Sequence, residues 1–111
     1  MITNSTTLGT LPWSAPEVLE NRAYNLSVDV YSFGIVMWEV LTRDLPYGDI
    51  KFLHQIKAVV IQGGRPDIPD NFWDSDGDYL ALTTKCWDQD PDERPTFQQV
   101  EKELAQLYYK K

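Results

Sequence analysis

Two acidic runs contain the residue types that bind calcium in helix–loop–helix sites. In the first run, carboxylates occupy the first, third and fifth positions of such a loop, at Asp74, Asp76 and Asp78. Its sixth position is Tyr79 instead of the glycine that the turn requires, and its twelfth is Lys85 instead of a bidentate glutamate. The second run, which begins at Asp88, fails at the same two positions. We therefore expect no metal site in either run.

The chain has one cysteine, Cys86, and one histidine, His54. A single cysteine excludes an internal disulfide and a cysteine-based zinc site, and no second metal ligand lies near His54 at a useful spacing. Cys86 adjoins Trp87 in an apolar stretch, which predicts a buried structural thiol. We assign a catalytic role to neither residue.

Length and composition indicate one globular domain over residues 1–111, with 42% hydrophobic and 13% aromatic residues. Ten basic and seventeen acidic residues give a net charge of -7, which argues against nucleic-acid binding. The first seven residues, MITNSTT, lack the basic flank and apolar core of a signal peptide. We expect a cytoplasmic protein that binds no membrane.

The segment 27–43, SVDVYSFGIVMWEVLTR, predicts the helix around which the domain packs. Its apolar residues cover almost the whole circumference, as in a buried helix, and the run is shorter than the roughly 20 residues of a membrane span. Ser27 is a plausible N-cap, and Asp29 suits the positive first turn. Gly34 in the helix interior predicts close approach by another element.

Apolar periodicity predicts further helices at 14–20, 51–62, 78–87 and 96–109, and an extended stretch at 65–76. The pairs Ser14–Glu17 and Thr96–Gln99 have the spacing of capping boxes. No segment shows strand alternation, so the chain as present is expected to be all-α.

Five motifs follow one another in an order that carries a resemblance. They are GTLPWSAPE at 9–17, SVDVYSFGIVMWEVLT at 27–42, LPYGD at 45–49, GGRPDIP at 63–69 and CWDQDPDERPTF at 86–97. The series resembles the C-terminal part of a eukaryotic protein kinase domain, an α+β fold when complete, from the activation segment to the last helix. Within this family the resemblance is to tyrosine kinases and to the tyrosine-kinase-like serine/threonine kinases, and it rests on the combination of the motifs DVYSFG, MWE, CW and RPTF. Gly9-Thr10 favours the serine/threonine side, although the choice stays open.

The resemblance places residues 1–17 at the end of the activation segment and residues 18–111 in the helical C-lobe. It implies candidate phosphorylation sites at Thr3, Ser5, Thr6 and Thr7, for which a plain polar terminus is the alternative. It also implies that the pocket for the substrate residue after the phosphoacceptor is lined by Thr10, Leu11, Pro12 and Trp13.

Two structural roles also follow from the resemblance. Glu17 would pair with Arg94 and anchor the activation segment, a geometry for which a planar guanidinium is suited. Glu17 can serve in the capping box as well. Asp29 would accept hydrogen bonds from the backbone of the catalytic loop.

The catalytic loop, the Asp-Phe-Gly motif, the glycine-rich phosphate loop and the ATP-binding lysine of the family are absent from the 111 residues. The complete kinase would use ATP and Mg²⁺, whereas we expect this chain alone to bind neither and to be inactive. One hypothesis is therefore a C-terminal kinase fragment whose partners are the missing N-terminal half and protein or peptide substrates. The alternative is a non-catalytic binding or decoy module. Without a catalytic loop against it, the central helix would expose an apolar face and leave Asp29 buried and unpaired, so we expect loose packing and self-association.

Overall fold

The computed structural model describes residues 11–109, apart from the side chains of residues 74 and 75. Its elements are η2 (Leu11–Trp13), α1 (Pro16–Leu19), α2 (Ser27–Thr42), α3 (Leu53–Ile61), α4 (Asn71–Cys86), η3 (Pro91–Glu93) and α5 (Phe97–Tyr109). No strand occurs in this part of the chain, which confirms the all-α prediction.

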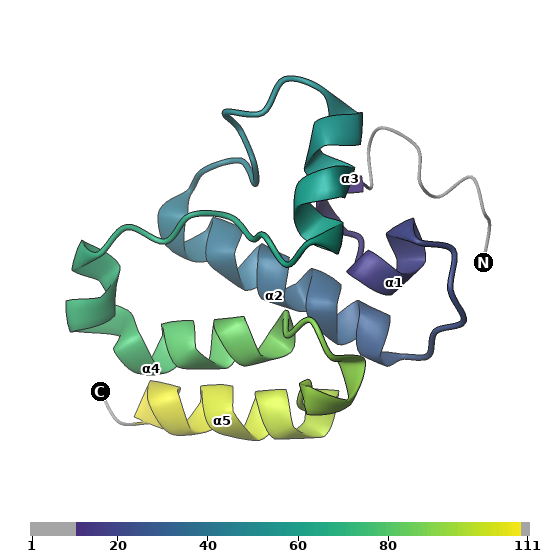
Figure 1. The fold of residues 1–111 in the computed structure, drawn as a ribbon. Helices are drawn as coiled ribbons and strands as arrows, with labels where there is room; N and C mark the ends of the chain where they lie inside the picture. The colour runs from purple at the N-terminus through teal and green to yellow at the C-terminus, as the bar shows by residue number, and fades with distance from the viewer. Residues whose placement is uncertain (1–10, 110–111) are drawn as a thin grey trace.

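Helix α2 is the central element of the fold (Figure 1). One face of α2 packs in a core cluster with η2, α1 and α3, to which it contributes Tyr31, Ile35 and Trp38. The other face contributes Val30 and Met37 to a second cluster with α4 and α5. A helix with apolar residues on most of its circumference is buried on two sides because each side finds a different partner.

Gly34 makes the packing of α2 against α4 possible. A Cβ atom at this position would lie 2.9 Å from the Cβ of Cys86 and 3.2 Å from the carbonyl oxygen of Thr83. The prediction of a close approach at Gly34 is therefore confirmed. Cys86 is fully buried, as predicted, and burial raises the pKa of its thiol to about 11.

The prediction of Ser27 as the N-cap of α2 is wrong. The N-cap residue is Leu26, and the backbone N–H of Ser27 donates to Oδ1 of Asn25 at 2.9 Å. The helix begins one residue earlier than predicted because the side chain of Asn25 supplies the acceptor that the first turn needs.

The capping box Ser14–Glu17 is also wrong, whereas Thr96–Gln99 is confirmed. Ala15 is the N-cap of α1, and no side chain caps this helix. At α5, the backbone N–H of Thr96 donates to Oε1 of Gln99 at 2.8 Å, and the N–H of Gln99 donates to Oγ1 of Thr96 at 3.1 Å. Glu17 does not complete a box because an arginine holds its carboxylate, as described below.

Helix α4 begins well before the predicted residue 78. It starts at Asn71 and passes through a kink at Asp76, whose φ of -126° and ψ of 29° are not helical. The predicted extended stretch at 65–76 is therefore wrong from residue 71 onward. Aspartate and glycine have low helix propensity, which explains why the sequence pattern did not indicate this part of the helix.

The outer side of α2 is less buried than predicted. Val36 and Val40, one helical turn apart, are 40% and 68% exposed, because no described element covers them. None of the described helices combines the length and the apolar character needed to cross a bilayer.

Candidate functional site

The segment before α1 is held against α2 by two side-chain hydrogen bonds. The indole Nε1–H of Trp13 donates to Oε1 of Glu39 at 2.7 Å, and the hydroxyl of Ser32 donates to the carbonyl of Trp13 at 2.7 Å. Both acceptor–donor pairs join residues far apart in sequence, so α2 fixes the position and orientation of the Trp13 ring.

Leu11, Pro12 and Trp13 form the single turn η2, in which Leu11 is buried and the other two are partly exposed. The backbone N–H of Ser14 donates to the carbonyl of Leu11 at 3.1 Å and closes the turn. These three residues were expected to line a substrate pocket together with Thr10. Thr10 lies outside the described residues, as do the candidate phosphorylation sites Thr3, Ser5, Thr6 and Thr7.

The structure brings Glu17 and Arg94 together in a buried, bidentate ion pair. Nη1 of Arg94 donates to Oε2 of Glu17 at 2.7 Å, and Nη2 donates to Oε1 at 3.1 Å. The two residues are 77 positions apart, and their side chains are 0% and 3% exposed for Arg94 and Glu17. Two parallel charge-assisted hydrogen bonds fix both the distance and the plane of the pair.

The remaining donors of Arg94 reach the backbone of two further segments. Nε donates to the carbonyl of Asp88 at 2.8 Å, and Nη1 also donates to the carbonyl of Ser27 at 3.3 Å. A buried guanidinium is tolerated when its charge is paired and its N–H groups find acceptors, and Arg94 meets both conditions. It therefore ties α1 to the start of α2 and to the loop before α5.

Tyr31 lies beside this ion pair and interacts with two guanidinium groups. The guanidinium carbon of Arg94 is 5.0 Å from the centroid of its ring, and that of Arg65 is 4.9 Å away. Both distances fall within the range of cation–π attraction. Burial raises the pKa of Tyr31, and the nearby Arg65 opposes part of that rise. The phenol therefore stays neutral over the physiological range.

Asp29 is exposed in the first turn of α2, so the prediction that it would be buried without a partner is wrong. Solvent satisfies its carboxylate because no described element lies over it. The expected partner, the backbone of a catalytic loop, is not part of this sequence.

Among residues 11–109, apart from the side chains of residues 74 and 75, no group of three or more histidine, cysteine, aspartate or glutamate side chains is placed to hold a metal ion.

Some of the positioning residues were not anticipated from the sequence. Glu39 and Ser32 hold Trp13, and Arg65 stacks on Tyr31, but none of these pairs is close in sequence. A helical pattern reports which residues face a core, but not which distant side chain they meet there.

Comparison with known proteins finds protein kinases, both as a family and as individual relatives. The family described as protein tyrosine and serine/threonine kinase matches residues 2–104. A protein of Arabidopsis thaliana named as a serine/threonine-protein kinase is 42% identical over 99 residues, which are 89% of this chain and 17% of that protein. A Dictyostelium discoideum protein named "Probable serine/threonine-protein kinase" is 39% identical over 103 residues, which are 93% of this chain and 8% of that protein. The chain thus spans less than a fifth of the length of these relatives.

Proposed function

Because the chain belongs to the protein tyrosine and serine/threonine kinase family, we propose that it forms the helical C-terminal part of a kinase domain. The complete protein would transfer the γ-phosphate of ATP to serine or threonine side chains of other proteins. The names of the curated relatives support serine/threonine specificity. The motifs DVYSFG, MWE, CW and RPTF support membership of the tyrosine-kinase-like group.

The observation that carries this proposal is the bidentate pair of Glu17 and Arg94. It holds Glu17, the last residue of the proposed activation segment, to the body of the helical lobe. Next to this anchor, η2 is fixed to α2 through Trp13. A segment that must present a peptide to a catalytic centre needs such positioning, because small displacements lower the rate of transfer.

In this proposal, Leu11, Pro12 and Trp13, together with Thr10, receive the substrate residue that follows the phosphoacceptor. Thr3, Ser5, Thr6 and Thr7 accept regulatory phosphate, which orders activation segments through arginine pairing. The exposed carboxylate of Asp29 accepts hydrogen bonds from the backbone of the catalytic loop.

The catalytic half is the partner that this chain requires. Phosphoryl transfer depends on Mg²⁺, a lysine and aspartates that position and stabilise the transferred group. The motifs that supply them are absent from the 111 residues, so the other half of the domain would hold ATP and Mg²⁺. A single cysteine is consistent with a reducing compartment, and a cytoplasmic location is part of the proposal.

A chimera tests the proposal directly. The matching region of the Dictyostelium discoideum relative is replaced by residues 2–104 of this chain, and phosphate transfer to a mixture of serine, threonine and tyrosine peptides is measured. We expect transfer to serine and threonine, and a loss of about tenfold or more in kcat/KM when Glu17→Gln is added. Asp92→Asn, an exposed change outside the anchor, serves as the matched control.

Two outcomes would contradict the proposal. A folded chimera without transfer would favour the non-catalytic binding module, and transfer confined to tyrosine would overturn the specificity. The isolated 111-residue chain, assayed with ATP and Mg²⁺ in parallel, is expected to transfer no phosphate.

A further inference from the structure

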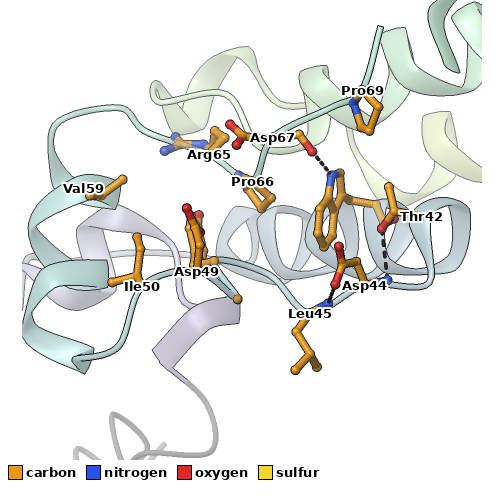
Figure 2. A pocket seen from close by; sticks show the side chains of 13 residues that line it. Thr42, Asp44, Leu45, Asp49, Ile50, Val59, Arg65, Pro66, Asp67 and Pro69 are labelled. Carbon is orange, nitrogen blue, oxygen red and sulfur yellow. Dashed lines mark hydrogen bonds between the residues drawn. The ribbon is translucent and has the colours of Figure 1, made fainter. Parts of the chain in front are cut away.

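A pocket of about 620 Å³ opens at the C-terminal end of α2. The end of α2, the following loop, α3 and the segment 65–69 form its wall (Figure 2). The volume falls in the range of sites that hold a small ligand or a few residues of a peptide. It is far larger than a single guanidinium or ammonium group needs.

Three carboxylates belong to the wall of this pocket: Asp44, Asp49 and Asp67. Figure 2 shows Asp44 and Asp49 on two sides of the pocket, with Asp67 on the segment that runs above them. Oδ1 of Asp44 accepts one hydrogen bond from the backbone N–H of Leu45 at 2.9 Å, and no described residue donates to its second oxygen. All three aspartates are exposed, so their charge can act on an approaching molecule.

Arg65 is the one cationic residue among the described residues of the wall, and its donors are already engaged. Nε donates to the carbonyl of Trp87 at 2.9 Å, Nη1 to the carbonyl of Gly64 at 2.6 Å, and Nη2 to Oε1 of Gln89 at 2.6 Å. Its guanidinium also stacks on Tyr31. Arg65 is therefore held by its own neighbours, and the pocket keeps an excess of negative charge.

Apolar side chains complete the wall. Leu45 and Val59 are 69% and 37% exposed, and Ile50 is partly exposed. Tyr47 also lines the pocket, but it is only 6% exposed and its buried hydroxyl interacts with that of Tyr31 in the core. A ligand with an aliphatic stem and a cationic donor end would match both parts of this surface.

We propose that this pocket binds an arginine side chain of an extended polypeptide segment. The planar guanidinium suits carboxylates that approach from different sides, and its stem covers the apolar residues. The volume beyond the guanidinium admits the residues that flank the arginine. This contact goes beyond the proposed function, because it captures a partner through residues other than Leu11, Pro12 and Trp13 and requires no phosphate transfer.

The experiment measures peptide binding to the full 111-residue chain by fluorescence anisotropy. The probe is the labelled peptide acetyl-Gly-Leu-Arg-Leu-Gly-amide, and its counterpart carries the neutral isostere citrulline in place of arginine. We expect the arginine peptide to bind at least about tenfold more tightly, since hydrogen bonds between charged groups are worth that much. Raising the salt concentration from about 50 to about 500 mM should weaken binding of the arginine peptide but not of the citrulline peptide.

Charge-removing variants locate the contact. Asp49→Asn, Asp44→Asn and Asp67→Asn should each raise the Kd about three- to tenfold, while the matched control Asp92→Asn leaves it unchanged. Circular dichroism verifies that each variant is folded. A second readout is the ¹H–¹⁵N spectrum, in which the indole signal of Trp38, a pocket residue whose Nε1–H donates to the carbonyl of Asp67 at 2.8 Å, should shift on titration.

Three results would overturn the proposal. The first is equal affinity for the arginine and citrulline peptides, and the second is an unchanged Kd in all three folded pocket variants. The third is displacement of the arginine peptide by an equal concentration of spermidine, which would mean that the pocket selects charge alone and not a polypeptide.

Discussion

Arg94 shows how one buried charged residue can organise a small domain. Its guanidinium satisfies Glu17 and two backbone carbonyls, and it stacks on Tyr31. Breaking a buried ion pair is costly because the remaining charge loses its partner and cannot regain water. Removing the pair should therefore destabilise several segments of the domain at once.

We expect Glu17→Gln to lower the free energy of unfolding by about 3 kcal/mol, measured by urea denaturation. Arg94→Lys should lower it by a similar amount, since an ammonium group cannot reproduce the two parallel hydrogen bonds. In a double-mutant cycle, the combined variant should lose much less than the sum of the single variants. Additive losses would show that the two side chains do not stabilise the fold as a pair.

The raised pKa of Cys86 predicts a loss of stability at alkaline pH. The folded protein holds the thiol proton up to a pKa of about 11, whereas the unfolded chain releases it near a pKa of about 8.5. Between these values the folded state binds more protons, so the free energy of unfolding falls as the pH rises, by at most about 1.4 kcal/mol per pH unit. This decline should be shallower in Cys86→Ala than in the wild type between pH 8.5 and 10, as followed by urea titrations. Equal slopes in the two proteins would contradict the assignment.

At the scale of elements, the contact of α2 with α4 depends on the absence of a side chain at Gly34. The neighbours that a new Cβ would meet are a Cβ and a backbone carbonyl, neither of which can rotate away. The two helices would have to separate, and the cluster that they share with α5 would loosen.

Gly34→Ala should therefore destabilise the protein by about 1 to 3 kcal/mol, despite the gain in helix propensity. Gly77→Ala is the matched control, because Gly77 lies in α4 and a Cβ there meets no heavy atom within 4 Å. That variant should gain about 0.5 to 1 kcal/mol. Thermal unfolding followed by circular dichroism compares the two, and equal behaviour would show that space at Gly34 is not limiting.

The elements differ in how well the sequence foretold them. Helices α2, α3 and α5 lie within two residues of their predicted bounds because each has a continuous apolar pattern. The first turns of α4 were missed because Asp76 and Gly77 interrupt that pattern. The Glu17–Arg94 contact was anticipated only through resemblance to a family, since no local pattern relates residues 77 positions apart. The pocket beside Asp49 was not anticipated at all, because it is built from four separate segments.

For the molecule as a whole, the proposed function requires that another part of the protein cover the outer side of α2. Val36 and Val40 are exposed there, on a helix that is otherwise buried on two sides. An apolar surface on a central helix marks a place where another part of a protein docks. In the proposed complete kinase, the catalytic half covers this side.

The isolated chain should therefore self-associate through this surface. Sedimentation velocity is expected to show concentration-dependent dimers or larger species for the wild type, and mainly monomer for the double variant Val36→Gln, Val40→Gln. Glutamine is a better helix former than valine, so at these exposed positions the melting temperature should stay the same or rise slightly. Leu26→Gln, which changes a still more exposed apolar residue (79%) at the other end of α2, is the matched control and should associate like the wild type. Wild-type protein that stays monomeric at all concentrations, or a double variant that associates as strongly, would mean that this face needs no cover and would remove one support for a docking catalytic half.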